Sequence, residues 1–278
     1  MRRNDGGQVG FEPKHPSLRR VLLFGPTEVI VMDTWKYFDI THKHHLLCNP
    51  ISKTKFEHFC SLLKLQSSAH VLDIACGKGE YLVRLAEIYG ISGVGVDISP
   101  FCINDCRKKH RERIPEAKLE FVEMDGARYQ PDTPELFDVS MCLGASWVFK
   151  GHRGTLKALR GMTKPGGLVI VGEPFWLKEP EDGYLEASQF TRDSYRSHEE
   201  NITIGEEEEL TILYTIVSNQ DDWDQYEALQ WWAAEDYIQS HPDDPDNKDL
   251  LERTKKSREI YLRWGRDTMN WAICIFRK

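Results

Sequence analysis

The chain's clearest pattern is an alternation of short apolar runs with segments whose apolar residues recur every three or four positions. Continuous runs of this length are typical of strands buried on both faces, whereas the longer spacing is typical of amphipathic helices. Between residue 70 and about residue 174, the alternation predicts a parallel sheet covered by helices on both faces. The expected strands are residues 71–75, 93–97, 119–124, 137–143 and 168–171, with a tight turn at 164–167 before the last of them.

Regular patterns continue on both sides of this segment. Residues 33–65 have a helical pattern, with Phe56 and Phe59 on its apolar face. Two later strands are expected. One is at 210–217, which is rich in β-branched and aromatic residues, and the other is at 269–276, where apolar residues alternate with smaller or exposed ones.

About 50 residues, Ser218 to Arg266, separate these last two strands. Trp223 and Tyr226 begin a series of aromatic and apolar residues at three-residue steps, and Ile260 belongs to a second helical segment. A structureless loop of this length is improbable in a compact domain. We therefore expect a helical cap, joined by residues 175–200, over the carboxyl ends of the strands. The alternative is a dimer interface or an ordinary packing extension.

These patterns divide the chain into three kinds of segment. Residues 1–31 mix Gly, Pro and basic residues without periodicity and are expected to form a weakly ordered leader, with Met32 as an alternative start. The expected core comprises residues 32–174, 205–218 and 267–278, and the expected insertion or cap segments are 175–204 and 219–266.

Composition narrows the function classes. The chain has 278 residues, 40% of them apolar and 29% charged, which is a globular composition. Its net charge of −8 suits a phosphate backbone poorly, so no nucleic-acid partner is expected. The 7 cysteines form no Cys-x-x-Cys, which indicates a reduced, cytoplasmic setting, and we assign no metal site. No apolar run reaches the roughly 18 to 20 residues that span a bilayer, so no membrane partner is expected. No oligomeric state is predicted.

Candidate chemistry gathers where the first two predicted strands end, because ligands of such sheets bind beyond the carboxyl ends of the strands. The loop 73–80, Asp-Ile-Ala-Cys-Gly-Lys-Gly-Glu, contains glycines that permit close backbone approach to a ligand. Asp97 ends the second strand, where a carboxylate can accept both hydroxyls of a ribose. A dinucleotide enzyme would share these features. However, Leu82 replaces the third glycine of Gly-x-Gly-x-x-Gly, and Asp73 and Glu80 would repel a pyrophosphate.

Four motifs in this order resemble those of class I S-adenosylmethionine (SAM)-dependent methyltransferases. They are the strand and loop 71–79, Asp97, Met124-Asp125-Gly126, and the helix and turn 159–167. The resemblance implies an α/β fold with a Rossmann-like, mostly parallel sheet, helices on both faces and an antiparallel last strand. It also implies SAM as the cofactor and S-adenosylhomocysteine (SAH) as the product.

The same resemblance implies roles for single residues. Asp97 is expected to bind the ribose hydroxyls and Asp125 the adenine amino group, while Gly77 lets the loop touch the cofactor. The other expected cofactor contacts are Asp73, Ala75, Cys76, Gly79, Ile98, Gly126, Leu143 and Gly144. For Asp73, the alternative is that it only holds the loop through backbone amides.

A narrower resemblance covers about residues 32–278. The segments 144–147, 172–176 and 222–227 resemble the bacterial YjhP-type methyltransferases, a resemblance that brings no substrate with it. Leu143-Gly144-Ala145-Ser146 stands where amino-methyltransferases of nucleobases and of protein glutamine have Asn-Pro-Pro-Tyr, which counts against those activities. The expected methyl acceptor is a small molecule.

A methyl group on a sulfonium is already activated, so the protein mainly has to align donor and acceptor. The candidate catalytic residues are Glu173 and His152, although Glu173 could lie in a solvated loop and His152 on the surface at a helix start. The candidate acceptor-binding residues are His45, Trp147, Trp176, Trp223 and Tyr226.

Two other function classes are compatible with these residues. One is a SAM-binding protein, or an enzyme that uses SAM for different chemistry. It would bind SAM but would not release SAH with any methyl acceptor. The other is a nicotinamide-dependent oxidoreductase, disfavoured by the missing glycine and by Asp125, which would bind NAD and not SAM.

Overall fold

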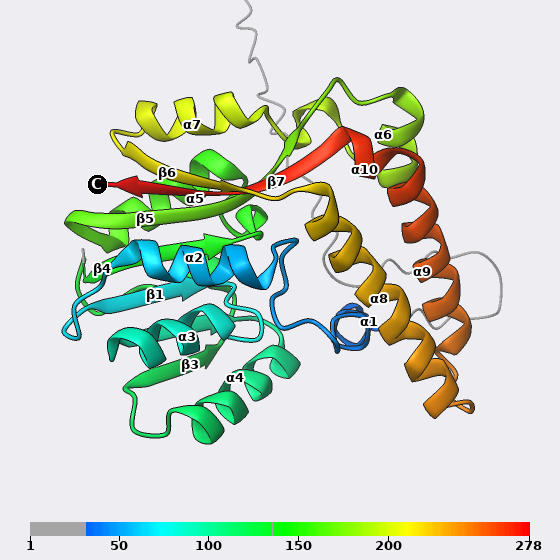
Figure 1. The fold of residues 1–278 in the computed structure, drawn as a ribbon, viewed down its shortest axis with the longest axis horizontal. Coiled ribbons are helices and arrows are strands. Elements are labelled where there is room, and N and C mark those ends of the chain that lie inside the picture. The colour runs from blue at the N-terminus through cyan, green and yellow to red at the C-terminus, as the bar shows by residue number, and fades with distance from the viewer. Residues whose placement is uncertain (1–31, 135) are drawn as a thin grey trace, which may run out of the picture.

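The computed structural model describes residues 32–134 and 136–278, so the predicted leader at 1–31 lies outside the described residues. Its centre is a seven-stranded sheet in the order β3-β2-β1-β4-β5-β7-β6 (Figure 1). The strands are β1 His70–Ile74, β2 Ser92–Asp97, β3 Leu119–Glu123, β4 Phe137–Leu143, β5 Thr163–Trp176, β6 Thr211–Val217 and β7 Met269–Arg277.

Strands β1 to β5 pair in parallel, and β7 inserts between β5 and β6 antiparallel to both. The predicted mostly parallel sheet with an antiparallel last strand is therefore confirmed. In the sheet, β1 lies between β2 and β4. The chain builds the sheet outward from β1 on one side through β2 and β3, and then on the other side from β4, so the strand order reverses between β1 and β4. In sheets of this kind, ligands bind in the crevice outside the strands' carboxyl ends at that point.

Helices cover both faces of the sheet. One layer consists of α2 Lys53–Leu63, α3 Glu80–Tyr89 and α4 Pro100–Arg113, and the other contains α5 His152–Met162 and α7 His198–Glu207. Phe59, Leu85 and Ile103 fill the core of the first layer, and Leu156 and Phe276 that of the second. Burial on both sides explains why the central parallel strands β1, β2 and β4 are mostly apolar.

The remaining helices form a cap beyond the carboxyl ends of the parallel strands (Figure 1). They are α1 Thr34–Thr41, α6 Asp182–Ser188, α8 Gln220–Ser240, α9 Asn247–Ile260 and α10 Arg266–Thr268, with a π-helical turn, Tyr261–Gly265, between the last two. Short 3₁₀ turns occur at Gly126–Arg128, Ser146–Phe149 and Arg192–Ser194. The helices expected between the last two strands are thus confirmed.

Local sequence explains where the long cap helix begins. Asn219 is the N-cap of α8, and its side chain accepts a hydrogen bond from the backbone N–H of Asp222 at 2.9 Å. The Asp222 side chain accepts one in return from the Asn219 N–H at 2.8 Å, which completes a capping box. Asp221 and Asp222 also place negative charge at the positive end of the helix dipole.

The structure corrects the predicted division of the chain in three places. Helix α1, expected in the core, packs on α8 in the cap, because residues 42–52 interrupt the predicted 33–65 helical segment. Helix α7, expected in the insertion 175–204, lies on the sheet, where a Cβ at Gly205 would come within 2.3 Å of the Phe276 ring. Strand β5 extends to Trp176 instead of ending near Gly172, since β7 pairs with it from Leu168 to Trp176.

The predicted tight turn at 164–167 also lies within β5. The pairing with β4 jumps there from Thr163 to Leu168, and Gly166 has a φ of +79°, so the turn survives as an irregularity inside the strand.

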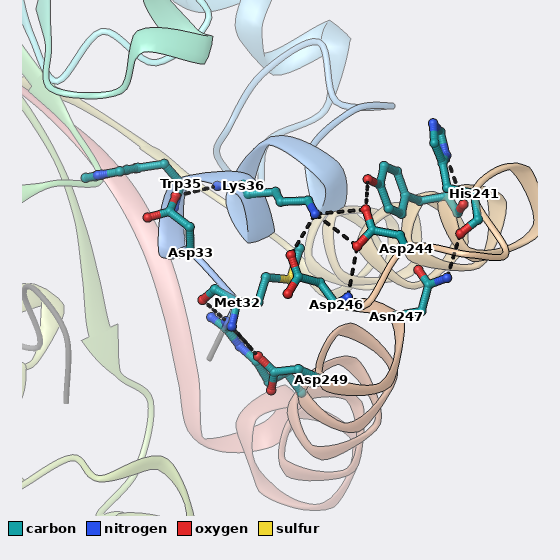
Figure 2. A network of polar contacts seen from close by, with 11 residues as sticks. Met32, Asp33, Trp35, Lys36, His241, Asp244, Asp246, Asn247 and Asp249 are labelled. Atoms are coloured by element: carbon teal, nitrogen blue, oxygen red, sulfur yellow. Dashed lines mark hydrogen bonds and ion pairs between the residues drawn. The ribbon is translucent and has the colours of Figure 1, made fainter. Parts of the chain in front are cut away.

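A polar network ties α1 to the turn between α8 and α9 (Figure 2). The Lys36 ammonium lies 2.8 Å from Asp244 and 2.6 Å from Asp246, and the Met32 backbone N–H donates to Asp249 at 3.1 Å. The two carboxylates raise the pKa of Lys36, and the ammonium lowers that of Asp244. The network holds the far end of the cap, where Met32, Ile40, Ala234 and Leu250 form an apolar cluster.

Candidate functional site

The loop after β1 has a backbone that few residue types adopt. Gly77 and Gly79 have φ values of +52° and +71°, and Ala75, which is not a glycine, has a φ of +56°. L-residues in this left-handed region are strained by roughly 1–2 kcal/mol. The loop therefore stores strain at Ala75 and depends on glycine at the next two positive-φ positions, in front of the N-terminus of α3.

Asp97, at the end of β2, holds this loop. Its two carboxylate oxygens accept hydrogen bonds from the backbone N–H groups of Gly77 and Ser99, both at 2.8 Å. Burial raises the pKa of Asp97, and the backbone hydrogen bonds act in the opposite direction. The next residue, Ile98, is 48% exposed and presents an apolar surface beside the carboxylate.

Asp73 lies one strand away in β1 and is almost completely buried. Its Oδ2 has no hydrogen-bond partner among the described residues. Burial, and then the charge of Asp97, raise the pKa of Asp73 well above its usual range. A buried carboxylate oxygen without a partner calls for a donor, and a cationic ligand group would supply both the hydrogen bond and the charge.

Asp125 and Gly126 follow β3. Asp125 is exposed, and its side chain accepts a hydrogen bond from the Ala127 backbone N–H at 2.9 Å, which begins a 3₁₀ turn. Gly126 is buried against Ile74, so that the turn packs against the end of β1. The structure thus brings Asp73, Asp97 and Asp125 to the carboxyl ends of three adjacent strands.

Residues 42–51 close over this edge. The buried Lys78 ammonium donates to the His42 carbonyl at 2.9 Å and lies 3.4 Å from Asp105, and the Asn49 amide donates to the Leu143 carbonyl at 3.0 Å. A narrow pocket remains between residues 46–49 and the loop, lined among others by Asp73, Ala75, Cys76, Gly77 and Leu143. A wider surface hollow at 90–92 and 113–118 lies at the amino end of β2 and contains none of the predicted site residues.

Cys76, expected at the cofactor, lies at the base of this loop. Its sulfur is 4.0 Å from that of Cys106, which donates to the Gly77 carbonyl at 3.2 Å. Gly144, with a φ of +87°, follows Leu143 at the end of β4, and a Cβ there would lie 2.7 Å from the Asn49 amide nitrogen.

Glu173, near the carboxyl end of β5, lies next to His152, the first residue of α5. Both are buried, and Glu173 Oε2 lies 3.9 Å from His152 Nδ1. Ser146 donates to Glu173 Oε1 at 2.9 Å, and His152 Nε2 contacts the Asn201 carbonyl at 2.9 Å. Burial raises the pKa of Glu173 to about 8 and lowers that of His152. The alternatives of a solvated loop for Glu173 and a surface position for His152 are therefore wrong.

The predicted acceptor-binding residues divide into two groups and one outlier. His45 Nε2 contacts the Tyr226 carbonyl at 2.8 Å, and Trp223 lies edge-on to Tyr226 with 6.2 Å between ring centroids. Trp176 belongs to a second aromatic group, 5.2 Å from Tyr195. Trp147 is 59% exposed and joins neither group.

Sequence reasoning missed several residues of this region. His42 contacts the Tyr226 hydroxyl through Nε2 at 2.8 Å, and burial lowers the pKa of His42 to about 3 and that of His45 to about 4, so both rings are neutral. The Oε2 atom of Glu227 is buried and has no hydrogen-bond partner among the described residues. Its only sequence signal was its place in the segment 222–227, and an acid in an acidic helix normally faces solvent.

Within the described residues, no group of three or more His, Cys, Asp or Glu is placed to hold a metal ion. None of the helices in the described part of the chain is long and apolar enough to cross a membrane.

Comparison with known proteins shows which proteins this chain is similar to. Residues 71–167 match the family model described as a methyltransferase domain. The chain is similar to the protein YjhP of Escherichia coli, 26% identical over 246 residues, with 87% of this chain and 98% of YjhP covered. A 120-residue stretch is 32% identical to trans-aconitate 2-methyltransferase of Paracidovorax citrulli and covers 42% of this chain and 43% of that enzyme.

A solved structure extends the match to the cap. The SAM-dependent methyltransferase of Geobacter sulfurreducens, crystallised with SAH, is 26% identical, with a TM-score of 0.81 over 87% of this chain and 97% of that one. Its coverage includes elements on both sides of the 71–167 segment. The chain therefore contains a methyltransferase domain, and the sheet order, the loop with its three acids and these matches together support SAM-dependent methyl transfer.

Proposed function

We propose that the chain transfers a methyl group from SAM to a small-molecule acceptor bound between the carboxyl ends of the strands and the cap. The observation that carries the proposal is the buried, unpartnered Oδ2 of Asp73 beside the glycine loop, because a sulfonium cofactor with an α-ammonium group fits such a site. Asp97 would bind the ribose hydroxyls and Asp125 the adenine amino group. Ala75, Cys76, Gly77, Gly79, Ile98, Gly126, Leu143 and Gly144 would line the cofactor's path.

When bound, the cofactor supplies an electrophilic methyl group, which a lone pair of the acceptor takes as SAH leaves. The protein's part is to align the two and to exclude water. The cap supports this division of labour, since it lies over the strand ends, and we assign acceptor binding to His45, Trp176, Trp223 and Tyr226. The exposed Trp147 would contribute only at the entrance.

Glu173 and His152 are the proposed catalytic pair. Glu173 would accept a proton from the acceptor or orient it, because its raised pKa of about 8 lies near physiological pH, and His152 would position Glu173. Replacement of Glu173 by Gln should lower kcat while the affinity for SAH stays unchanged. An equal loss of SAH affinity would instead place Glu173 in the cofactor site.

A small-molecule acceptor is supported by the relative that acts, by its name, on trans-aconitate, and by the net charge of −8, which disfavours nucleic acid. A cytoplasmic location is supported by the seven described cysteines, all of which are thiols.

The cofactor assignment is tested by calorimetry with SAH. Asp97→Ala and Asp125→Ala should each weaken SAH binding about ten- to a hundredfold, the equivalent of one lost charged hydrogen bond. Glu120→Ala, an exposed acid on β3, is the matched control and should bind SAH like the parent chain. Because Asp97 also holds Gly77 and Ser99, thermal unfolding is measured in parallel. Parent-like affinity in both site variants would remove these acids from the cofactor site.

A further inference from the structure

Glu227 stands apart from the other acids of the cap. Its Oε2 is shielded from solvent and has no hydrogen-bond partner among the described residues, and burial alone raises the pKa of Glu227 to about 7. Neither the cofactor site nor the Glu173–His152 pair uses it. A shielded carboxylate oxygen without a donor is rare in proteins, and an absent ligand is one of its ordinary explanations.

Aromatic rings flank this carboxylate along α8. Trp223, Glu227 and Trp231 follow one another at four-residue steps, so they share one face of the helix. The Tyr261 ring lies 6.4 Å from the Trp223 ring and 6.3 Å from the Trp231 ring, measured between centroids. It therefore faces the turn that carries Glu227, between the two indoles. Trp231 Nε1 is likewise buried without a partner, so this face of α8 leaves both an acceptor and a donor unused.

Four tyrosines from different parts of the cap lie within range of the charge of this carboxylate. Burial is the main cause of the raised pKa of Tyr37 in α1, Tyr184 in α6, Tyr226 in α8 and Tyr261 in the π-helical turn, and the charge of Glu227 adds to it in each case. Glu227 thus lies where these elements converge, whereas the far end of the cap is closed by the Met32–Leu250 apolar cluster. We call Glu227, Trp223, Trp231 and these four tyrosines the Glu227 site.

The Glu227 site connects to the cofactor loop. The hydroxyl of Tyr226, the neighbour of Glu227 in sequence, contacts His42 at 2.8 Å, and the His42 carbonyl accepts from Lys78 in the loop at 2.9 Å. Tyr184 links it to the aromatic group of Trp176, with 6.1 Å between the ring centroids. A ligand at Glu227 would therefore lie between the two sets of proposed acceptor-binding residues.

Charge decides which ligand fits. Both nearby histidines are neutral, and the Lys78 ammonium is paired with Asp105, so neither offers a positive charge to an anionic acceptor. A cation already lies against one ring of the site, since the Arg258 guanidinium is over the Trp231 ring, 5.9 Å from its centroid. Aromatic rings beside a carboxylate are the ordinary means by which proteins recognise an ammonium group.

We propose that the Glu227 site binds a positively charged amino group of the methyl acceptor, so that the acceptor is a small amine. This inference rests on the proposed function, since it assigns a chemical class to the acceptor of the same reaction. It commits Glu227 to acceptor recognition and leaves the cofactor to the three strand-end acids.

The test uses two probes of equal shape on the full chain saturated with SAH. Choline carries a quaternary ammonium, and 3,3-dimethylbutan-1-ol is its neutral isostere. The parent chain should bind choline about tenfold more tightly than the alcohol, because only choline carries a positive charge for the Glu227 carboxylate to attract. Glu227→Gln should abolish this preference with unchanged SAH affinity and an unchanged melting temperature. The matched control, Glu235→Gln, changes an exposed acid two turns further along α8 and should keep the preference.

A pH series provides a second readout. The choline preference should grow as the pH rises from 6 to 8, because Glu227 then loses its proton, while the four tyrosines, whose pKa values are raised, keep theirs. Normal SAH binding without a choline preference in the parent chain, or a preference that survives in Glu227→Gln, overturns the amine assignment and leaves the methyltransferase proposal intact. Failure of the parent chain to bind SAH overturns both.

Discussion

Two glycines of the cofactor loop, alike in sequence, have different surroundings, and alanine at each should separate binding from stability. Both have positive φ, so alanine costs roughly 1–2 kcal/mol of strain at either position. At Gly77, a Cβ would lie 3.6 Å from the Cys48 sulfur, an ordinary contact, and would face the pocket under residues 46–49. At Gly79, a Cβ would lie 2.7 Å from the Cys106 sulfur and 3.2 Å from the Phe121 ring, inside the core.

Overpacking of a core typically adds about 1–3 kcal/mol, so Gly79→Ala should destabilise the fold by about 2–5 kcal/mol and Gly77→Ala by only about 1–2. Gly77→Ala should instead weaken SAH binding by about tenfold or more, because its methyl group occupies space that the cofactor needs. Urea unfolding without ligand measures the first effect, and calorimetry with SAH measures the second. The reasoning is refuted if Gly77→Ala binds SAH like the parent chain, or if it destabilises the fold as much as Gly79→Ala does.

Other predictions follow from single contacts. Ala75→Gly should stabilise the chain by about 1 kcal/mol in urea unfolding, since it removes left-handed strain; a loss of stability would contradict the strain. As the pH rises from 5 to 8, the free energy of unfolding of the parent chain should fall relative to that of Glu173→Gln. The carboxyl of Glu173 ionises first in the unfolded chain, while in the folded chain, where its pKa is about 8, it keeps its proton. Parallel curves for the two chains would argue against a buried acid. Trp223→Ala should raise the acceptor's KM with SAH affinity unchanged, and weakened SAH binding would move Trp223 to the cofactor. Lys36→Met should lower the melting temperature less at 1 M salt than at low salt, and a salt-independent effect would mean that the ion pairs with Asp244 and Asp246 contribute nothing.

Local patterns were sufficient for the sheet and for the positions of the strand-end acids that we propose bind the cofactor. Strand β4 was predicted with its observed bounds because Phe137–Leu143 is a short, mostly apolar segment. Parallel strands end at one edge, so Asp97 and Asp125 had to share it once the strands were placed. The turn at 164–167 failed as a strand boundary because Thr163, before it, already pairs with Phe137 of β4, and Gly166 and Gly167 exchange backbone hydrogen bonds with Lys278, more than 100 residues later in the chain.

What the sequence determined by itself, then, is the part of this protein set by short-range periodicity: the alternating sheet and its glycine loop, hence the cofactor class. The surroundings of the residues that we propose for acceptor binding and catalysis were determined only by the tertiary structure, because these residues are buried by segments far apart in the chain. Glu173 and His152 are 21 positions apart in sequence and meet only through packing of α5 on β5. Glu227 follows three aspartates of the same helix, and its sequence context predicts a solvent-facing acid, whereas in the structure it is largely buried in the cap. A carboxylate's chemistry depends on what surrounds it in space, and sequence spacing does not record that.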